Sequence, residues 1–343
     1  MKPGKKIILQ IILLAFIILL AYIISVTQKK GEYISLAGFV QGTTYHVTYE
    51  SKNGENLQFL IDSLLADFDR SLSVYLPNSL ISKINRNEPG ITVDEKFSTV
   101  FNKSYEVFKK TDGAFDITVG PIVNALGFGS TDTLNVDSAL IESLLPYVGM
   151  EKVTLQDGIL VKKYPNIVLD VNAIAQGYSV DLVVEFLEQR GIRNYMVEIG
   201  GEVRTRGRND RNLVWRIGID KPLEGNMLPG ANLQAIVALK NRSLATSGNY
   251  RKYYEKNGIK FVHTINPKTG YPVVSNLLSA TVVADDCMTA DAYATAFMVF
   301  GVERSIEFLE ENKFLDAYLI YADQEGKFRV YVTKRLQKFI EEQ

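Results

Sequence analysis

Residues 263–300 contain the side chains with the clearest chemical potential. The segment reads HTINPKTGYP, then a strand-like SATVVA, then DDCMTADAYATAF, whose alanine-rich run predicts a helix. In that helix Asp291 and Thr295 are four positions apart, so the carboxylate and the hydroxyl project from the same face. Such a pair could bind a hard cation, because Mg²⁺ prefers oxygen ligands and takes few of them from protein when phosphates and water supply the rest.

The same residues also permit a purely structural interpretation. Thr289 could cap the helix, Asp291 would then favour the helix dipole in the first turn, and Thr295 could bond its own backbone. Taken alone, the spacing favours this structural interpretation over the metal site.

A second candidate site lies in LDVNAIAQGYSVD, residues 169–181. A predicted strand ends at Asp170 and a helix begins among small residues, so a phosphate or an adenine could approach the exposed N–H groups at the helix start. The alternative is that Asp170 or Asn172 caps the helix and that the small residues allow close packing. The residues alone favour this alternative.

Two further positions could contribute polar groups. In DGAFDITVGP, Asp116 follows a turn at 112–113, where its carboxylate could bind ribose hydroxyls or a flavin ring, or merely form an Asx-type turn. His263, one of two histidines, precedes a polar turn that would hold it near a cleft, although a single histidine at a strand end is commonly structural. His46, inside a predicted strand, is interpreted as structural.

Both helices and strands must position these groups. Strands are predicted at 39–49, 167–169, 195–199, 214–219 and 233–239, and helices at 57–72, 97–110 and 172–190. Helices and strands do not alternate strictly, so we predict an α+β fold with mainly antiparallel or mixed sheets rather than a doubly wound parallel fold.

Composition limits the function classes. The chain has 343 residues, of which 46% are hydrophobic, so it can bury a large core. Its 38 Lys and Arg balance 39 Asp and Glu, and this balance argues against a nucleic-acid-binding protein. Cys287 is the only cysteine, so the chain has no internal disulfide.

Several separated blocks together resemble the ApbE family, the FAD:protein FMN transferases. In chain order they are GTTYHV at 42–47, SLSVYLPNSLISKIN at 71–85, DGAFDITVGP at 112–121, LDVNAIAQGYSVD at 169–181, IGGE at 199–202, ATSGNY at 245–250 and the segment from residue 263. Their order and spacing cover nearly the whole chain beyond residue 40. The resemblance implies one compact α+β unit, residues 31–343, with a flavin cleft.

The resemblance also implies roles for individual residues. It implies a metal held by Asp291, Thr295 and the backbone carbonyl of Ala173, with His263 as the general base. It implies contacts to FAD from Gln41, Tyr75, Ala114, Phe115, Asp116, Asp170, Gln176 and Ile265. Gln176 departs from the family pattern, because many relatives have lysine there. Glutamine donates a hydrogen bond but supplies no charge to the diphosphate, so electrostatic help must be weaker or come from elsewhere. Gln41 and Tyr75 also differ from the methionine and tryptophan common in relatives.

The reaction implied by the resemblance is transfer of FMN from FAD to a protein hydroxyl. The diphosphate would bind Mg²⁺, and a threonine or serine of the acceptor, helped by His263, would attack the FMN phosphorus and release AMP. The expected acceptors are flavoproteins of membrane electron-transport complexes. Two alternatives stay open: an FAD pyrophosphatase that produces FMN and AMP, and a membrane-tethered flavin-binding protein without turnover.

Residues 1–30 form a separate unit. Three lysines precede the apolar run 7–26 and two follow it. About 20 apolar residues in a helix span a bilayer core, whereas a cleaved signal has an apolar region of about 7 to 15 residues. We therefore expect an uncleaved anchor in the bacterial inner membrane, with the lysine-bearing tail in the cytoplasm and the catalytic domain on the periplasmic side.

Overall fold

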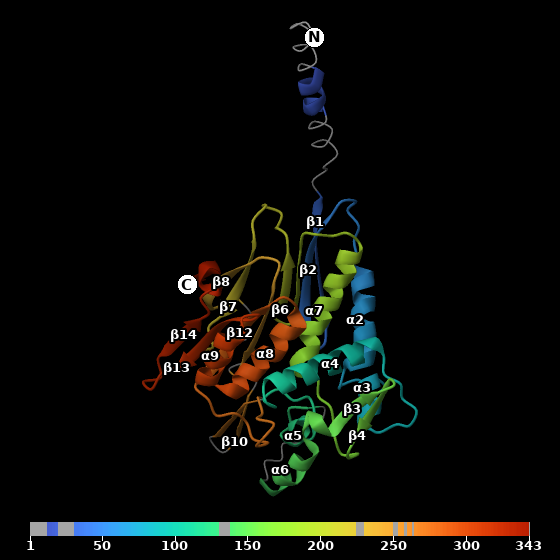
Figure 1. Ribbon diagram of the computed structural model, residues 1–343, viewed down its shortest axis with the longest axis vertical. Coiled ribbons are helices and arrows are strands. Elements are labelled where there is room, and N and C mark those ends of the chain that lie inside the picture. Colours follow the sequence, from blue (N-terminus) through green and yellow to red (C-terminus); the bar gives the residue numbers. More distant parts are fainter. Residues whose placement is uncertain are drawn as a thin grey trace, which may run out of the picture.

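An eight-stranded antiparallel sheet, in the order β1-β2-β5-β6-β9-β12-β13-β14, runs through the structure (Figure 1). The computed structural model describes residues 12–19, 31–129, 138–223, 230–249, 253–256, 259–262 and 264–342. The strands are β1 (Glu32–Val40), β2 (Thr43–Ser51), β5 (Tyr195–Ile199), β6 (Glu202–Arg206), β9 (Ser243–Gly248), β12 (Leu277–Ala284), β13 (Asp316–Ala322) and β14 (Phe328–Val332).

A layer of helices covers one face of this sheet (Figure 1). They are α2 (Gln58–Leu72), α3 (Leu80–Asn85), α4 (Glu95–Lys110), α7 (Asn172–Gln189), α8 (Cys287–Phe300) and α9 (Val302–Glu311). Helix α8 has apolar residues on all sides and is accordingly buried along most of its length, packed against α7 and the sheet. These two central helices carry all three predicted metal ligands and Gln176, so their packing decides the geometry of the metal site.

A smaller sheet packs on the opposite face. Its strands are β15 (Ile340–Glu342), β8 (Leu233–Leu239) and β7 (Trp215–Asp220), in that order. A separate apolar cluster that includes Val237, Leu244 and Tyr318 fills the space between the two sheets. Strands β9, β12 and β13 of the large sheet are therefore covered on both faces, where they support the helical layer.

Short elements close the end of the molecule below α4 in Figure 1. They are α5 (Gly120–Ala125), α6 (Ser138–Leu144), the hairpin of β3 (Val153–Gln156) and β4 (Ile159–Lys162), and the hairpin of β10 (Tyr253–Lys256) and β11 (Ile259–Val262). Three 3₁₀ turns lie at Leu145–Tyr147, Met150–Lys152 and Leu336–Phe339. Ile122, Ile141 and Ile265 pack together here in a small core of their own.

The α+β prediction with antiparallel sheets is confirmed, and three local predictions are wrong. The predicted strand 39–49 is interrupted by a hairpin turn, in which Gln41 and Gly42 have φ values of 53° and 74°. The apolar run 167–169 forms only a single parallel bridge, Val168 to Val119. The cap of α8 is Asp286 rather than Thr289, because the Asp286 carboxylate accepts the Thr289 N–H at 2.7 Å.

The predicted anchor falls mostly outside the described residues. Of residues 7–26, only 12–19 are described, and they are helical. Within the described ranges, no helix is long and apolar enough to cross a bilayer.

Candidate functional site

Two segments far apart in the sequence meet at the start of α7. The Asp170 N–H donates to the carbonyl of Ile117 at 2.7 Å, and Val168 bridges Val119. Gly120 permits this approach, since a Cβ there would stand 2.5 Å from the Val168 carbonyl oxygen. The block at 112–121 is thereby joined to the block at 169–181, with Ile117 next to Asp170 just before α7.

A cluster of polar side chains lies at the N-terminus of α7. The Asp170 carboxylate accepts the Asn172 N–H at 2.9 Å, and the Asn172 amide donates to the Tyr75 hydroxyl at 3.3 Å. Burial raises the pKa of Asp170, while the Asn172 bond opposes the rise. Tyr75 is exposed, so its ring is available to stack on a ligand and is not part of the core. Tyr75 and Asp170, both predicted to contact FAD, therefore lie side by side.

Ser179 links Gln41 to the next turn of α7, which carries Gln176. The Ser179 hydroxyl donates to the Gln176 carbonyl at 2.7 Å and lies 3.3 Å from Gln41 Oε1. The Gln176 amide lies directly over Gly200, where any Cβ would collide with it. Gly200 has a φ of 64° at the turn after β5, which suits glycine. The IGGE block and the hairpin turn of Gln41 thus converge on the same helix.

The contact between α7 and α8 is built around Gly177 and Asp291. The Gly177 N–H donates to Asp291 Oδ2 at 2.9 Å. A Cβ at Gly177 would stand 2.5 Å from the Cys287 carbonyl oxygen and 2.8 Å from the Asp291 Cβ, so only glycine allows the two helices to come this close. In a regular α-helix the Gly177 N–H would bond to the carbonyl of Ala173, and here it also serves Asp291.

This contact fixes which residues face each other farther along the helices. Gly177 faces Asp291, and one turn on Asp181 accepts the N–H of Cys287, so the two helices run antiparallel. One turn in the other direction, the same register places Ala173 opposite Thr295. The Thr295 hydroxyl lies 3.2 Å from the hydroxyl of Ser247 on β9 and is not bonded to its own helix in any described contact. The three predicted metal ligands therefore lie together at one end of the α7 and α8 pair.

The donor chemistry at this point suits a hard cation. Asp291 is buried, yet within the described residues no donor reaches its Oδ1, while Oδ2 accepts from Gly177. Burial raises the pKa of Asp291 to about 7, partly offset by the Gly177 bond, and the nearby charge of Asp181 raises it further. A buried carboxylate oxygen, a threonine hydroxyl and a peptide carbonyl are all oxygen ligands of the kind Mg²⁺ takes. In the described part of the chain, no cluster of three His, Cys, Asp or Glu could hold a metal, so this site would depend on a single carboxylate.

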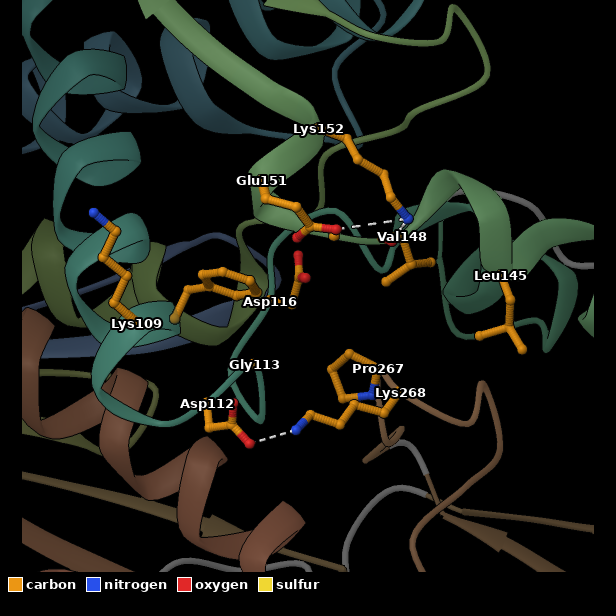
Figure 2. Close-up of a pocket in the computed structure, with 12 residues that line it drawn as sticks. Lys109, Asp112, Gly113, Asp116, Leu145, Val148, Glu151, Lys152, Pro267 and Lys268 are labelled. Carbon is orange, nitrogen blue, oxygen red and sulfur yellow. Dashed lines mark hydrogen bonds and ion pairs between the residues drawn. The ribbon is translucent and has the colours of Figure 1, made fainter.

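Asp116 lies at a separate cavity of about 470 Å³ (Figure 2). Its Oδ1 accepts the Thr118 N–H at 2.7 Å and its Oδ2 accepts the Met150 N–H at 3.2 Å, and burial raises its pKa to about 6. This is the Asx-type turn that the sequence offered as an alternative. The carboxylate holds the loop of residues 149–150 in place and lines the cavity, whereas Ala114 and Phe115 are buried and do not line it.

Lysines and carboxylates line the cavity in Figure 2 from three separate segments. Lys268 ion-pairs with Asp112 at 2.6 Å, and this pair ties the loop after residue 263 to the turn before Ala114. Glu151 and Lys152 face the opening from the opposite wall. The two blocks that the resemblance places at FAD are thus joined at this cavity.

Two predicted residues of the 263–273 loop have different outcomes. His263 lies outside the described residues. Ile265 is buried among Ile122, Leu126 and Ile141, where it packs the loop against α5 and α6. The loop is held as a hairpin by the Val273 N–H, which donates to the Thr264 carbonyl at 2.9 Å.

Sequence reasoning did not single out two residues that shape the site. Ser179 bonds to the predicted site residues Gln41 and Gln176, and Ser247 bonds to Thr295. Close packing was expected for the small residues of 169–181, and Gly177 shows it, because a Cβ there would collide with the backbone of α8. No sequence pattern near Ser247 predicted its contact with Thr295, which lies 48 positions away.

Comparisons with known proteins agree with this arrangement. The model of the ApbE family matches residues 41–319. The FAD:protein FMN transferase of Haemophilus influenzae is 37% identical over 350 residues, covering 98% of this chain and 97% of that protein. The structure of the flavin transferase ApbE from Vibrio cholerae superimposes with a TM-score of 0.80 at 35% identity, covering 90% of this chain and 99% of that one. The apo form of the flavinyl transferase ApbE from Pseudomonas stutzeri gives a TM-score of 0.80 at 29% identity, covering 91% and 98%.

Proposed function

The chain belongs to the ApbE family, and from that membership we propose that it is an FAD:protein FMN transferase. The structural observation that best supports the proposal is the register of α7 against α8. The bonds from Gly177 to Asp291 and from Cys287 to Asp181 bring Ala173, Asp291 and Thr295 to one place beside the helix start that carries Asp170. A diphosphate would fit such a junction, where oxygen ligands for a cation adjoin the positive end of a helix.

In the proposed reaction the hydroxyl oxygen of an acceptor threonine or serine forms a bond to the FMN-side phosphorus of FAD. The bond from that phosphorus to the bridging oxygen breaks, and AMP leaves with the bridging oxygen. The acceptor proton passes to a base, for which we propose His263. The product is an FMN phosphoester on the acceptor, so no oxidant or reductant is consumed.

The chain's own residues would hold FAD along α7. Tyr75 would stack on a ring of the ligand, the Asp170 carboxylate would accept from a hydroxyl or amine, and the Gln41 and Gln176 amides would donate to it. Ala173, Asp291 and Thr295 would hold Mg²⁺. The ion would neutralise charge that develops on the diphosphate as the bond breaks. A carboxylate must be ionised to bind a cation, so Mg²⁺ would lower the raised pKa of Asp291.

We also propose where the protein works. The apolar run 7–26 between lysines supports an anchor in the bacterial inner membrane with the catalytic domain on the periplasmic side. The acceptors would then be flavoproteins of membrane electron-transport complexes.

The proposal is tested by incubating the full-length chain with FAD, Mg²⁺ and a candidate acceptor that exposes a threonine. We expect the acceptor, weighed by mass spectrometry, to gain FMN less one water, with an equal amount of AMP released. AMP that appears at the same rate without acceptor would instead identify an FAD pyrophosphatase. FAD that stays intact in excess Mg²⁺ with several flavoprotein acceptors would identify a binding protein without turnover.

Gln176→Lys should strengthen FAD binding. The variant places a cation on the turn of α7 next to Asp170, where the resemblance puts the diphosphate, and a hydrogen bond to a charged group contributes about 1 kcal/mol more than a neutral one. We expect the Kd for FAD to fall roughly 3- to 10-fold, with a steeper dependence on ionic strength. Titration by flavin fluorescence measures both effects. An unchanged Kd would show that Gln176 does not face the diphosphate.

His263→Ala should slow transfer without weakening FAD binding. General-base help contributes about 10²- to 10⁴-fold to a rate, so we expect kcat to fall by that amount while the Kd for FAD stays within about twofold. His46→Ala is the matched control, because His46 lies on β2 and is held by Glu198 at 2.8 Å. Equal losses in the two variants would remove His263 from the mechanism.

A further inference from the structure

Asp181 connects α7 to the first turn of α8. Its Oδ1 accepts the Cys287 N–H at 2.9 Å and its Oδ2 accepts the Met288 N–H at 2.8 Å. These N–H groups open α8 and have no acceptor within their own helix. Asp286 caps the next N–H, that of Thr289. A carboxylate of α7 therefore accepts the first two N–H groups of α8.

Arg204 holds this carboxylate against the sheet. Its Nη1 lies 2.5 Å from Asp181 Oδ1, and it comes from β6 in the middle of the large sheet. Asp181 is only 4% exposed, and a buried carboxylate needs such compensation to remain ionised. Asp181 thus links three elements: α7, α8 and β6.

The contact of Asp181 with α8 also determines how α8 is oriented on α7. Asp181 and Gly177 are one turn apart on α7, and their partners Cys287 and Asp291 are one turn apart on α8. Two contacts one turn apart fix both the rotation of α8 and its position along α7. Helix α8 also packs against β9 and β12, but the Gly177 contact alone would not fix its angle to α7, and Thr295, two turns from Cys287, would move the most if that angle changed.

We propose that Asp181, held by Arg204, is a positioning residue that sets the register of α8 on α7 and thereby assembles the metal site from Ala173, Asp291 and Thr295. This inference rests on the proposed function, because it concerns the same metal site. Asp181 does not contact the metal itself, and it acts through the helix that carries two of the ligands.

Asp181→Asn tests the role with the least change in shape. The asparagine amide has only one acceptor oxygen, so its NH₂ group must face either the Arg204 guanidinium or the N–H of an α8 residue. In both orientations two hydrogen-bond donors would face each other. We expect the start of α8 to shift and the Kd for a divalent cation to rise at least ~10-fold, as is typical when a residue that orients a ligand is lost. Arg204→Lys keeps the charge but loses the planar fork, so it should show a smaller rise.

The chain offers a matched control in Glu188→Gln. Glu188 also lies on α7 and ion-pairs with an arginine of β6, Arg206, but it bonds to Tyr195 and to no residue of α8 in any described contact. Its loss should lower thermal stability without changing the cation Kd. Binding is measured on the full-length chain with Mn²⁺, whose free aqua ion gives an electron paramagnetic resonance signal that disappears on binding, so no transfer activity is needed.

Three outcomes decide the matter. A Kd raised in Asp181→Asn and unchanged in Glu188→Gln, in two folded proteins, supports the positioning role. Equal Kd values in both variants and the wild type overturn it while leaving the proposed function intact. A wild type that binds no Mn²⁺, with or without FAD, overturns both. If Asp181→Asn does not fold, Arg204→Lys decides, and a wild-type Kd in that variant counts against the proposal.

Discussion

Asp291→Asn should abolish FMN transfer and at the same time make the metal-free protein more stable at neutral and alkaline pH. The amide keeps an oxygen that can accept the Gly177 N–H, so the contact between α7 and α8 survives. It removes the only carboxylate of the proposed metal site. Loss of several kcal/mol of transition-state stabilisation lowers the rate by at least ~100-fold. Asp285→Asn is the control, because Asp285 precedes α8 in the same segment and is 88% exposed.

The stability gain follows from the ionisation of Asp291. Burial raises its pKa from 3.8 to about 7, so the folded protein holds a proton that the unfolded chain has released. The contribution of Asp291 to the free energy of unfolding is therefore fully present below pH ~4. It falls as the pH rises to ~7 and stays reduced above that pH. Asparagine has no charge to bury, so the variant should melt above the wild type at pH 8 in EDTA, and this difference should vanish near pH 4.

Thermal melts at pH 4, 6 and 8, with EDTA and with Mg²⁺, measure these effects. Comparing the two proteins at each pH cancels the contribution of Asp116, whose pKa burial raises to about 6. The charge of Asp181 is one of the causes that raise the pKa of Asp291, so its effect is part of the measured difference. Mg²⁺ should raise the melting temperature of the wild type and leave that of the variant unchanged. A variant that transfers FMN at the wild-type rate would remove Asp291 from the metal site.

Local patterns in the sequence were enough to predict the two helices that carry the site. Residues 172–190 and the alanine-rich segment after residue 284 show helical signals within a single window, and the structure has helices at Asn172–Gln189 and Cys287–Phe300. Strands β5 and β8 were equally visible as short apolar runs. The hairpin turn at Gln41 was missed, because the alternation of residues 45–49 was extended back to Phe39 across the run QGTT, which has no large apolar side chain.

The arrangement of the site could not be obtained from local patterns. The bond between Gly177 and Asp291 joins positions 114 apart, and the contact of Cys287 with Asp181 spans 106. These contacts depend on which faces of two buried helices meet. A helix that is apolar all round does not encode that choice in its own periodicity. The resemblance to a family supplied the residues, and the structure supplied the register that brings them together.

That register makes Gly177→Ala the second substitution with a large expected effect. On helix propensity alone alanine would stabilise α7 by about 0.5–1 kcal/mol. The added Cβ would instead stand 2.5 Å from the Cys287 carbonyl oxygen, which belongs to a backbone and cannot rotate away. The helices must separate, at a cost of about 1–3 kcal/mol, and Asp291 must move away from the Gly177 N–H. We expect transfer to fall at least ~100-fold, since a misplacement of about 1 Å costs that much.

Gly218→Ala is the matched control for this substitution. A Cβ at Gly218, on β7 in the small sheet, would also meet an atom at 2.5 Å, but that atom is the end of the flexible Leu233 side chain. It should transfer FMN at the wild-type rate, with a Mn²⁺ affinity equal to that of the wild type. Gly177→Ala should lose both properties together, because the carboxylate and the threonine hydroxyl lie on the displaced helix. If Gly177→Ala retained both while melting at a lower temperature, the close approach would serve stability alone, and the site would tolerate a separation of α7 and α8.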